Sequence, residues 1–92
     1  MSELLAVEKR SEGGYWLRAQ SLDGPIRSAL LLDDAEELSD GRLTDDEATA
    51  RATAEFLLEH QDAADLPNVI ELDEVLGAYE DAVEAILARR AD

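Results

Sequence analysis

The spacing of apolar residues changes once along this chain, near residue 33, and this change limits the possible folds more than any other feature. Before it, apolar and polar residues alternate, as in a strand with one buried face. After it, apolar residues recur every three or four positions, as along one side of a helix. A chain of 92 residues can bury only one hydrophobic core. The pattern therefore predicts a single α+β domain over residues 1–92, with a sheet followed by helices.

Glycine-containing turns at residues 12–14 and 23–25 divide the first third of the chain. The segments around them are rich in apolar residues at alternate positions. We therefore predict a three-stranded antiparallel β-meander, with strands at about 3–11, 15–22 and 26–32.

The register of each hairpin is predicted from the pairing that best separates charged from apolar side chains between the two faces. In the first hairpin, a three-residue loop does this by placing Glu8 opposite Arg18. In the second hairpin, the same argument predicts a three-residue loop with Leu17 opposite Leu31.

Two helices are predicted in the rest of the chain, at about 45–61 and 71–90, both packed on one face of the sheet. The first has small residues along one side, which favours close packing. The second has the most regular apolar stripe, with acidic residues on its opposite face. Gly77 lies inside this stripe and marks either a break, because glycine weakens a helix interior, or a close helix crossing.

The net charge of −15 is confined to the second part of the chain. Residues 1–32 hold four acidic and four basic side chains, whereas residues 33–92 hold nineteen acidic ones and four arginines. Such a field repels the phosphates of nucleic acids and anionic membranes, and attracts cations and basic proteins. We therefore predict no direct nucleic-acid binding. No apolar stretch is long enough to span a membrane, and the N-terminus is unlike a secretory signal, so a soluble cytoplasmic protein is predicted.

The sequence lacks the motifs of the common enzyme classes. It has no cysteine, no glycine-rich phosphate loop and no nucleophile elbow. His60 is the single histidine, and in the last turn of a helix it is better placed to contact free carbonyl groups than to act as a general base. We therefore predict neither enzymatic activity nor a cofactor.

The segment EELSDGRLTDDE, residues 36–47, partly resembles the calcium loop of an EF-hand. The matching residues are Asp40 at the fifth template position, Gly41 at the sixth, Leu43 at the eighth, Thr44 at the ninth and Glu47 at the twelfth. The first and third positions hold glutamate and leucine, so the entering half departs from the template. Asp40, Thr44 and Glu47 are the candidate metal ligands. Alternatively, Thr44 is the N-cap of a helix, and Glu47 completes a capping box with it.

Trp16, the single tryptophan, is predicted on the same sheet face as Arg18. Either the C-terminal helix covers it at an edge of the core, or it anchors a partner on an open surface.

The leading interpretation is a non-catalytic interaction or regulatory protein whose acidic helical surface binds a basic protein partner. The candidate partner-binding residues are Trp16, Arg18, Asp73, Glu80, Asp81 and Glu84. One alternative is divalent-cation binding at residues 36–47, and another is that the acidity serves only solubility or adaptation to salt. The apolar run at residues 29–32 would allow a dimer if it formed a free sheet edge.

Overall fold

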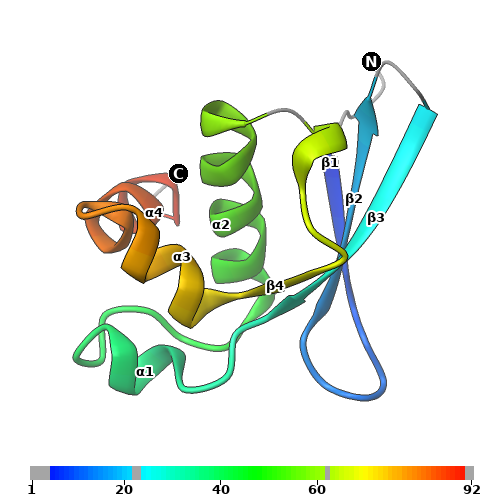
Figure 1. Cartoon of the computed structure of the whole chain (residues 1–92). Coiled ribbons are helices and arrows are strands. Elements are labelled where there is room, and N and C mark those ends of the chain that lie inside the picture. The colour runs from blue at the N-terminus through cyan, green and yellow to red at the C-terminus, as the bar shows by residue number, and fades with distance from the viewer. Residues whose placement is uncertain (1–4, 22–23, 62, 91–92) are drawn as a thin grey trace.

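A computed structural model describes residues 5–21, 24–61 and 63–90. It contains one four-stranded sheet with helices on one side (Figure 1). The elements in chain order are β1 (Leu5–Lys9), β2 (Tyr15–Ser21), β3 (Gly24–Leu31), α1 (Ala35–Leu38), α2 (Glu47–His60), the 3₁₀ turn η1 (Ala63–Asp65), β4 (Val69–Glu71), α3 (Leu72–Ala78) and α4 (Ala82–Arg90). The predicted α+β fold is confirmed, with four strands in a mixed sheet in place of three antiparallel ones. In the described ranges, no helix is long and apolar enough to cross a membrane.

The strand order is β1-β2-β3-β4, and β4 pairs in parallel with β3. The chain between β3 and β4 therefore passes through α1 and α2 before it returns to the sheet. The hydroxyl of Ser28 in β3 donates a hydrogen bond to the carbonyl oxygen of Pro67, just before β4, at 2.7 Å. Because Ala29 and Leu30 pair with both β2 and β4, β3 is an interior strand. The expectation of a free sheet edge within residues 29–32 is therefore wrong.

In the first hairpin, the side chains lie on the predicted faces of the sheet, although the register of the two strands differs from the predicted one. Glu8 lies opposite Trp16, two positions from the predicted partner Arg18. The backbone N–H of Arg10 donates to the carbonyl oxygen of Gly14 at 3.0 Å, which closes a loop of three residues. Since the displacement is even, every side chain stays on its predicted face.

The second hairpin has a different register from the predicted one. Leu17 lies opposite Ser28, three positions from Leu31. An odd displacement moves each side chain of β3 to the other face, so this prediction is wrong. The reason is the unbroken apolar run at residues 29–32, which offers an apolar side chain to either face and so gives no signal for register.

The hydrophobic core lies between the inner face of the sheet and α2. Helix α2 contacts β1 and β2, and α4 packs on α2 (Figure 1). Ala50 and Ala54 of α2 are fully buried, and their small side chains allow close packing. Phe56, at 2% exposure, and Ile86 of α4 fill the space around them. Helix α4, the second half of the segment predicted as one helix, therefore packs on the side of α2 that faces away from the sheet.

The stripe at residues 71–90 forms two helices, α3 and α4, with a break at residues 79–81. The break comes two residues after Gly77, where the sequence marks a candidate position. Tyr79 adopts an extended backbone while its N–H still donates to the carbonyl oxygen of Val75. The change of direction lets α4 lie against α2.

Candidate functional site

The loop at residues 36–47 is held by its own hydrogen bonds. Ser39 is buried, and its hydroxyl donates to the carbonyl oxygen of Ala35 and accepts from the N–H of Leu43, both at 2.7 Å. Asp40 and Gly41 adopt left-handed backbone conformations, with φ of 57° and 83°. The chain therefore reverses direction around a buried serine.

Helix α2 is capped by Asp46, so the prediction of Thr44 as the N-cap is wrong. The Oδ1 atom of Asp46 accepts from the N–H of Thr49 at 2.9 Å. The Thr44 hydroxyl donates to Oδ2 of Asp46 at 2.5 Å and so supports the cap from outside the helix. Burial alone would raise the pKa of Asp46, but the hydrogen bonds from Thr44 and Thr49 outweigh it, and the pKa lies below its ordinary value.

The structure does not assemble the predicted metal ligands into a site. Asp40 is exposed in the turn, Thr44 bonds to Asp46, and Glu47 is the first residue of α2. Within residues 5–21, 24–61 and 63–90, no group of three or more acidic or histidine side chains could hold a metal ion. The geometry of this loop therefore gives no support to calcium binding.

Replacing Asp46 with alanine should lower the unfolding free energy by about 1 kcal/mol at neutral pH, the usual effect of losing an N-cap. Because the folded pKa of Asp46 is below the unfolded value, its charge stabilises the protein above the unfolded pKa. This contribution disappears as the pH falls through the folded pKa. Urea unfolding of both proteins between neutral and strongly acidic pH measures the effect.

The matched control for this cap is Asp45→Ala, at the exposed neighbouring position. It removes the same charge but no cap hydrogen bond, so it should change stability by less than about 0.5 kcal/mol. Equal losses in the two variants would show that Asp46 acts only through its charge.

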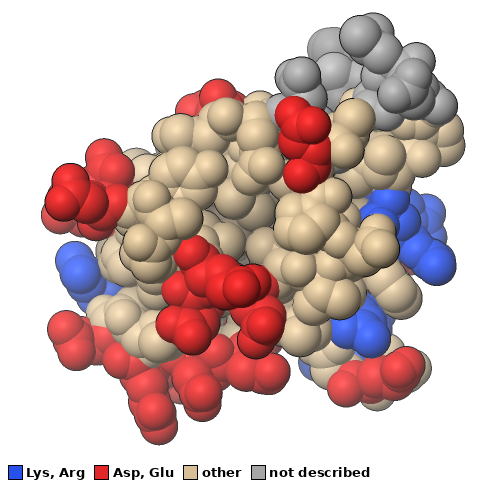
Figure 2. All heavy atoms as spheres, in the orientation of Figure 1, with Lys and Arg blue, Asp and Glu red and all other residues tan. Residues whose placement is uncertain are grey.

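Acidic side chains gather over the part of the molecule where Figure 1 places α1 and α3 (Figure 2). A hollow of about 130 Å³ lies among them. It is lined by Leu31, Asp33, Asp34, Leu38, Glu71, Leu72 and Asp73. Leu38 is 38% exposed. We call these seven residues the acidic surface.

The predicted partner-binding residues do not form one surface. Asp73 belongs to the acidic surface, whereas Glu80 and Asp81 lie in the link between α3 and α4, and Glu84 lies in the first turn of α4. All four are exposed. Trp16 and Arg18 are in β2, with side chains on the face of the sheet that points away from the helices.

Trp16 lies in a cluster of arginines on this outer face. The guanidinium carbons of Arg10 and Arg27 lie 4.7 and 4.2 Å from the centroid of its ring, within the range of cation–π contacts. Next to it, Arg18 forms an ion pair with Glu8. No described helix covers Trp16, because α4 packs on α2 on the other side of the sheet. The expectation of a core edge under the C-terminal helix is therefore wrong.

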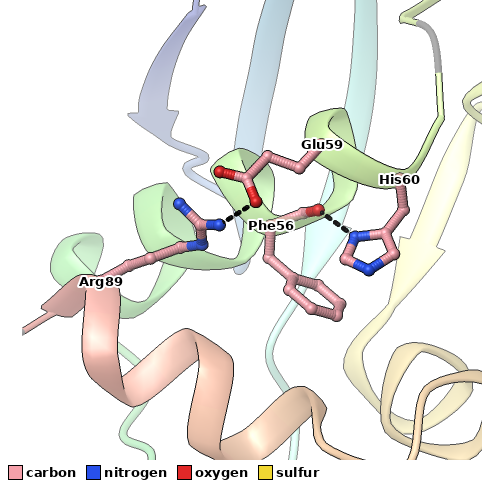
Figure 3. A network of polar contacts seen from close by, with 4 residues as sticks. All are labelled: Phe56, Glu59, His60 and Arg89. Atoms are coloured by element: carbon pink, nitrogen blue, oxygen red, sulfur yellow. Dashed lines mark hydrogen bonds and ion pairs between the residues drawn. The ribbon is translucent and has the colours of Figure 1, made fainter.

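His60 takes part in the packing between α2 and the break after α3. Its Nδ1 atom lies 2.9 Å from the carbonyl oxygen of Phe56, so the ring donates from Nδ1, as predicted for a helix end (Figure 3). Its ring centroid lies 4.4 Å from that of Phe56 and 4.8 Å from that of Tyr79. Beside it, the hydrogen bond from Arg89 of α4 lowers the pKa of Glu59 and ties α4 to α2.

The sequence predicts the acidic surface only in part. The abundance of acids after residue 33 is plain, but the surface combines α1 and the loop after β3 with β4 and α3. Neither α1 nor β4 is predicted from the sequence. Comparison with models of protein families, with curated proteins and with solved structures gives no match to this chain.

Proposed function

We propose that this chain is a non-catalytic binding protein, acting in the cytoplasm, whose acidic surface binds a basic segment of a protein partner. The observation that carries the proposal is the hollow of about 130 Å³ in which leucines lie among four carboxylates. The carboxylates attract a basic segment at long range and pair with its side chains. The exposed Leu38 supplies apolar area that can contact an apolar side chain of the partner.

The partner segment should combine lysine or arginine with an apolar residue. Its apolar side chain enters the hollow beside Leu38, and its basic side chains lie over Asp33 and Asp73. Burial of one leucine-sized side chain contributes about 1.5–3 kcal/mol to the free energy of binding. This is enough to distinguish binding in the hollow from charge attraction alone.

A suitable probe is a synthetic peptide with leucine between two runs of lysine and arginine, titrated by calorimetry at low and then moderate salt. We expect the double variant Asp33→Asn/Asp73→Asn to bind at least about fivefold more weakly than the unaltered chain, and binding to weaken as salt rises. Replacing the peptide leucine with serine should weaken binding about tenfold.

The matched control is Glu80→Gln/Asp81→Asn, which removes the same amount of charge outside the acidic surface. It should bind the peptide nearly as well as the unaltered chain. Equal weakening by the two double variants, together with no effect of the peptide leucine, would reduce the interaction to unspecific charge attraction. In that case the acidity serves solubility or adaptation to salt.

A further inference from the structure

The outer face of the sheet carries a row of apolar side chains in the middle. Trp16 lies opposite Ala29, and Ala29 lies opposite Val69, so the row crosses β2, β3 and β4. Trp16 is half-buried, and Val69 is 49% exposed. All described helices lie on the other side of the sheet (Figure 1). Ala29 is 6% exposed, and the guanidinium groups of Arg10 and Arg27 lie over the Trp16 ring, so the exposed apolar area of the row belongs mainly to Val69 and to the free part of Trp16.

Opposite charges lie on the two sides of this row. Two positions toward one end of the strands, Arg18 of β2 lies opposite Arg27 of β3. Two positions toward the other end, Leu31 lies opposite Glu71 of β4. At a rise of about 3.3 Å per residue, the arginines and Glu71 are separated by about 13 Å along the strands. We call Trp16, Arg18, Arg27, Leu31, Val69 and Glu71 the outer sheet face.

We propose that the outer sheet face binds a second copy of this chain in a two-fold symmetric, face-to-face dimer. The axis lies in the interface along the apolar row, so that Trp16 and Val69 meet the same row of the other copy. The rotation places Arg27 of one copy over Leu31 and beside Glu71 of the other. A two-fold interface needs a self-complementary surface, and this arrangement of charge and apolar area provides one.

Charge favours a second copy at this face over any other part of the surface. Two chains with a net charge of −15 repel each other through their acidic surfaces. On the outer side of the sheet, the arginines at positions 10, 18 and 27 balance the glutamates at positions 8, 12 and 71, and Glu12 forms an ion pair with Arg10. Two copies can therefore approach there without placing net negative charge against net negative charge.

The area of the face limits the strength of the dimer. Four strands at about 4.8 Å spacing and about 20 Å of strand length give about 400 Å² for each copy. Stable interfaces bury about 800 Å² for each partner, so the dimer is weak and forms at high protein concentration. Its two sheets pack about 10 Å apart with nearly aligned strands, as in a β-sandwich.

Sedimentation velocity of the full chain from about 10 µM to about 1 mM tests this dimer. We expect the sedimentation coefficient to rise with concentration for the unaltered chain, and Val69→Glu to weaken association at least about tenfold. The matched control is Leu38→Glu, which adds the same charge at the other large exposed apolar residue among the described positions. It should associate like the unaltered chain. A monomer at all concentrations, or equal effects of Val69→Glu and Leu38→Glu, would overturn the proposal.

A charge exchange tests the orientation of the two copies. Arg27→Glu should weaken association, and adding Glu71→Arg to it should restore most of the loss. Positions 27 and 71 of one copy are about 13 Å apart along the strands, so a new ion pair between them within one copy cannot explain the restored association. Failure of the second substitution to restore association, with both variants folded by circular dichroism, would overturn the proposed two-fold arrangement.

The two surfaces share Leu31 and Glu71, but the two proposals can be tested separately through residues that belong to only one of them. Val69→Glu should leave peptide binding unchanged, because Val69 does not line the hollow, whereas Leu38→Glu should weaken it. Raising salt should weaken binding of the basic peptide. Loss of peptide binding in Val69→Glu would contradict the assignment of two different interactions.

Discussion

The variant Phe56→Ala should lose about 3–5 kcal/mol of unfolding free energy, the range for removing a large buried aromatic side chain. Phe56 is 2% exposed in the centre of the core. Its ring forms an edge contact with Tyr79, with centroids 5.1 Å apart, and a tilted contact with His60. The substitution therefore leaves a cavity where α2 meets the break between α3 and α4. Urea unfolding followed by circular dichroism measures the loss.

The control for this cavity is Leu58→Ala, on the same helix at a partly buried position. It should cost clearly less, because less of the removed side chain is buried and the site is open to solvent on one side. Small domains have total stabilities of about 5–15 kcal/mol, so Phe56→Ala brings this chain close to unfolding. If both variants lost the same free energy, Phe56 would not be the centre of the core.

The variant Gly14→Ala should lose about 2–4 kcal/mol, for two separate reasons. Gly14 has φ of +75°, a conformation that costs an L-residue about 1–2 kcal/mol. In addition, an added Cβ would lie 2.7 Å from Cδ2 of Leu31 and 2.9 Å from the carbonyl oxygen of Leu30. The Leu31 side chain can rotate away, but the backbone oxygen belongs to an interior strand. Such overpacking adds about 1–3 kcal/mol.

Gly13 provides the control for this close approach. It also has positive φ, of +106°, but an added Cβ there meets no atom within 4 Å. Gly13→Ala should therefore show only the conformational part of the loss, and the difference from Gly14→Ala measures the contact with β3. Thermal unfolding of both variants gives this difference. Equal losses would mean that the hairpin loop moves away from β3 at little cost.

The two hairpins show when sequence patterns set a register. In the first, charged and apolar residues alternate, so the faces are predicted correctly even with the register displaced by two positions. In the second, residues 29–32 are all apolar, and the pattern has no period. The pairing of Leu17 with Ser28 depends on which side chains the helices cover, and this is tertiary information.

The short elements β4 and α1 could not be predicted from the sequence, for a different reason. Strand β4 has three residues and α1 has four. These are too few residues to show a repeating pattern of apolar side chains. The acidic surface depends on both, because β4 brings Glu71 beside β3 and α1 presents Leu38. The sequence could therefore predict that acids gather in the second part of the chain, but not which of them surround an apolar hollow.

Strand β4 also affects how the chain reaches its fold. Ser28 and Pro67, which join β3 to the start of β4, are 39 positions apart in sequence. Until residues 69–71 have been synthesised, one edge of β3 has no neighbouring strand, and residues 29–32 beside it are all apolar. Exposed apolar edges of this kind promote aggregation, and flanking charges oppose it. Asp33 and Asp34 follow the run directly, in the position where flanking charges oppose aggregation, so these acids have a consequence for folding that is separate from any binding.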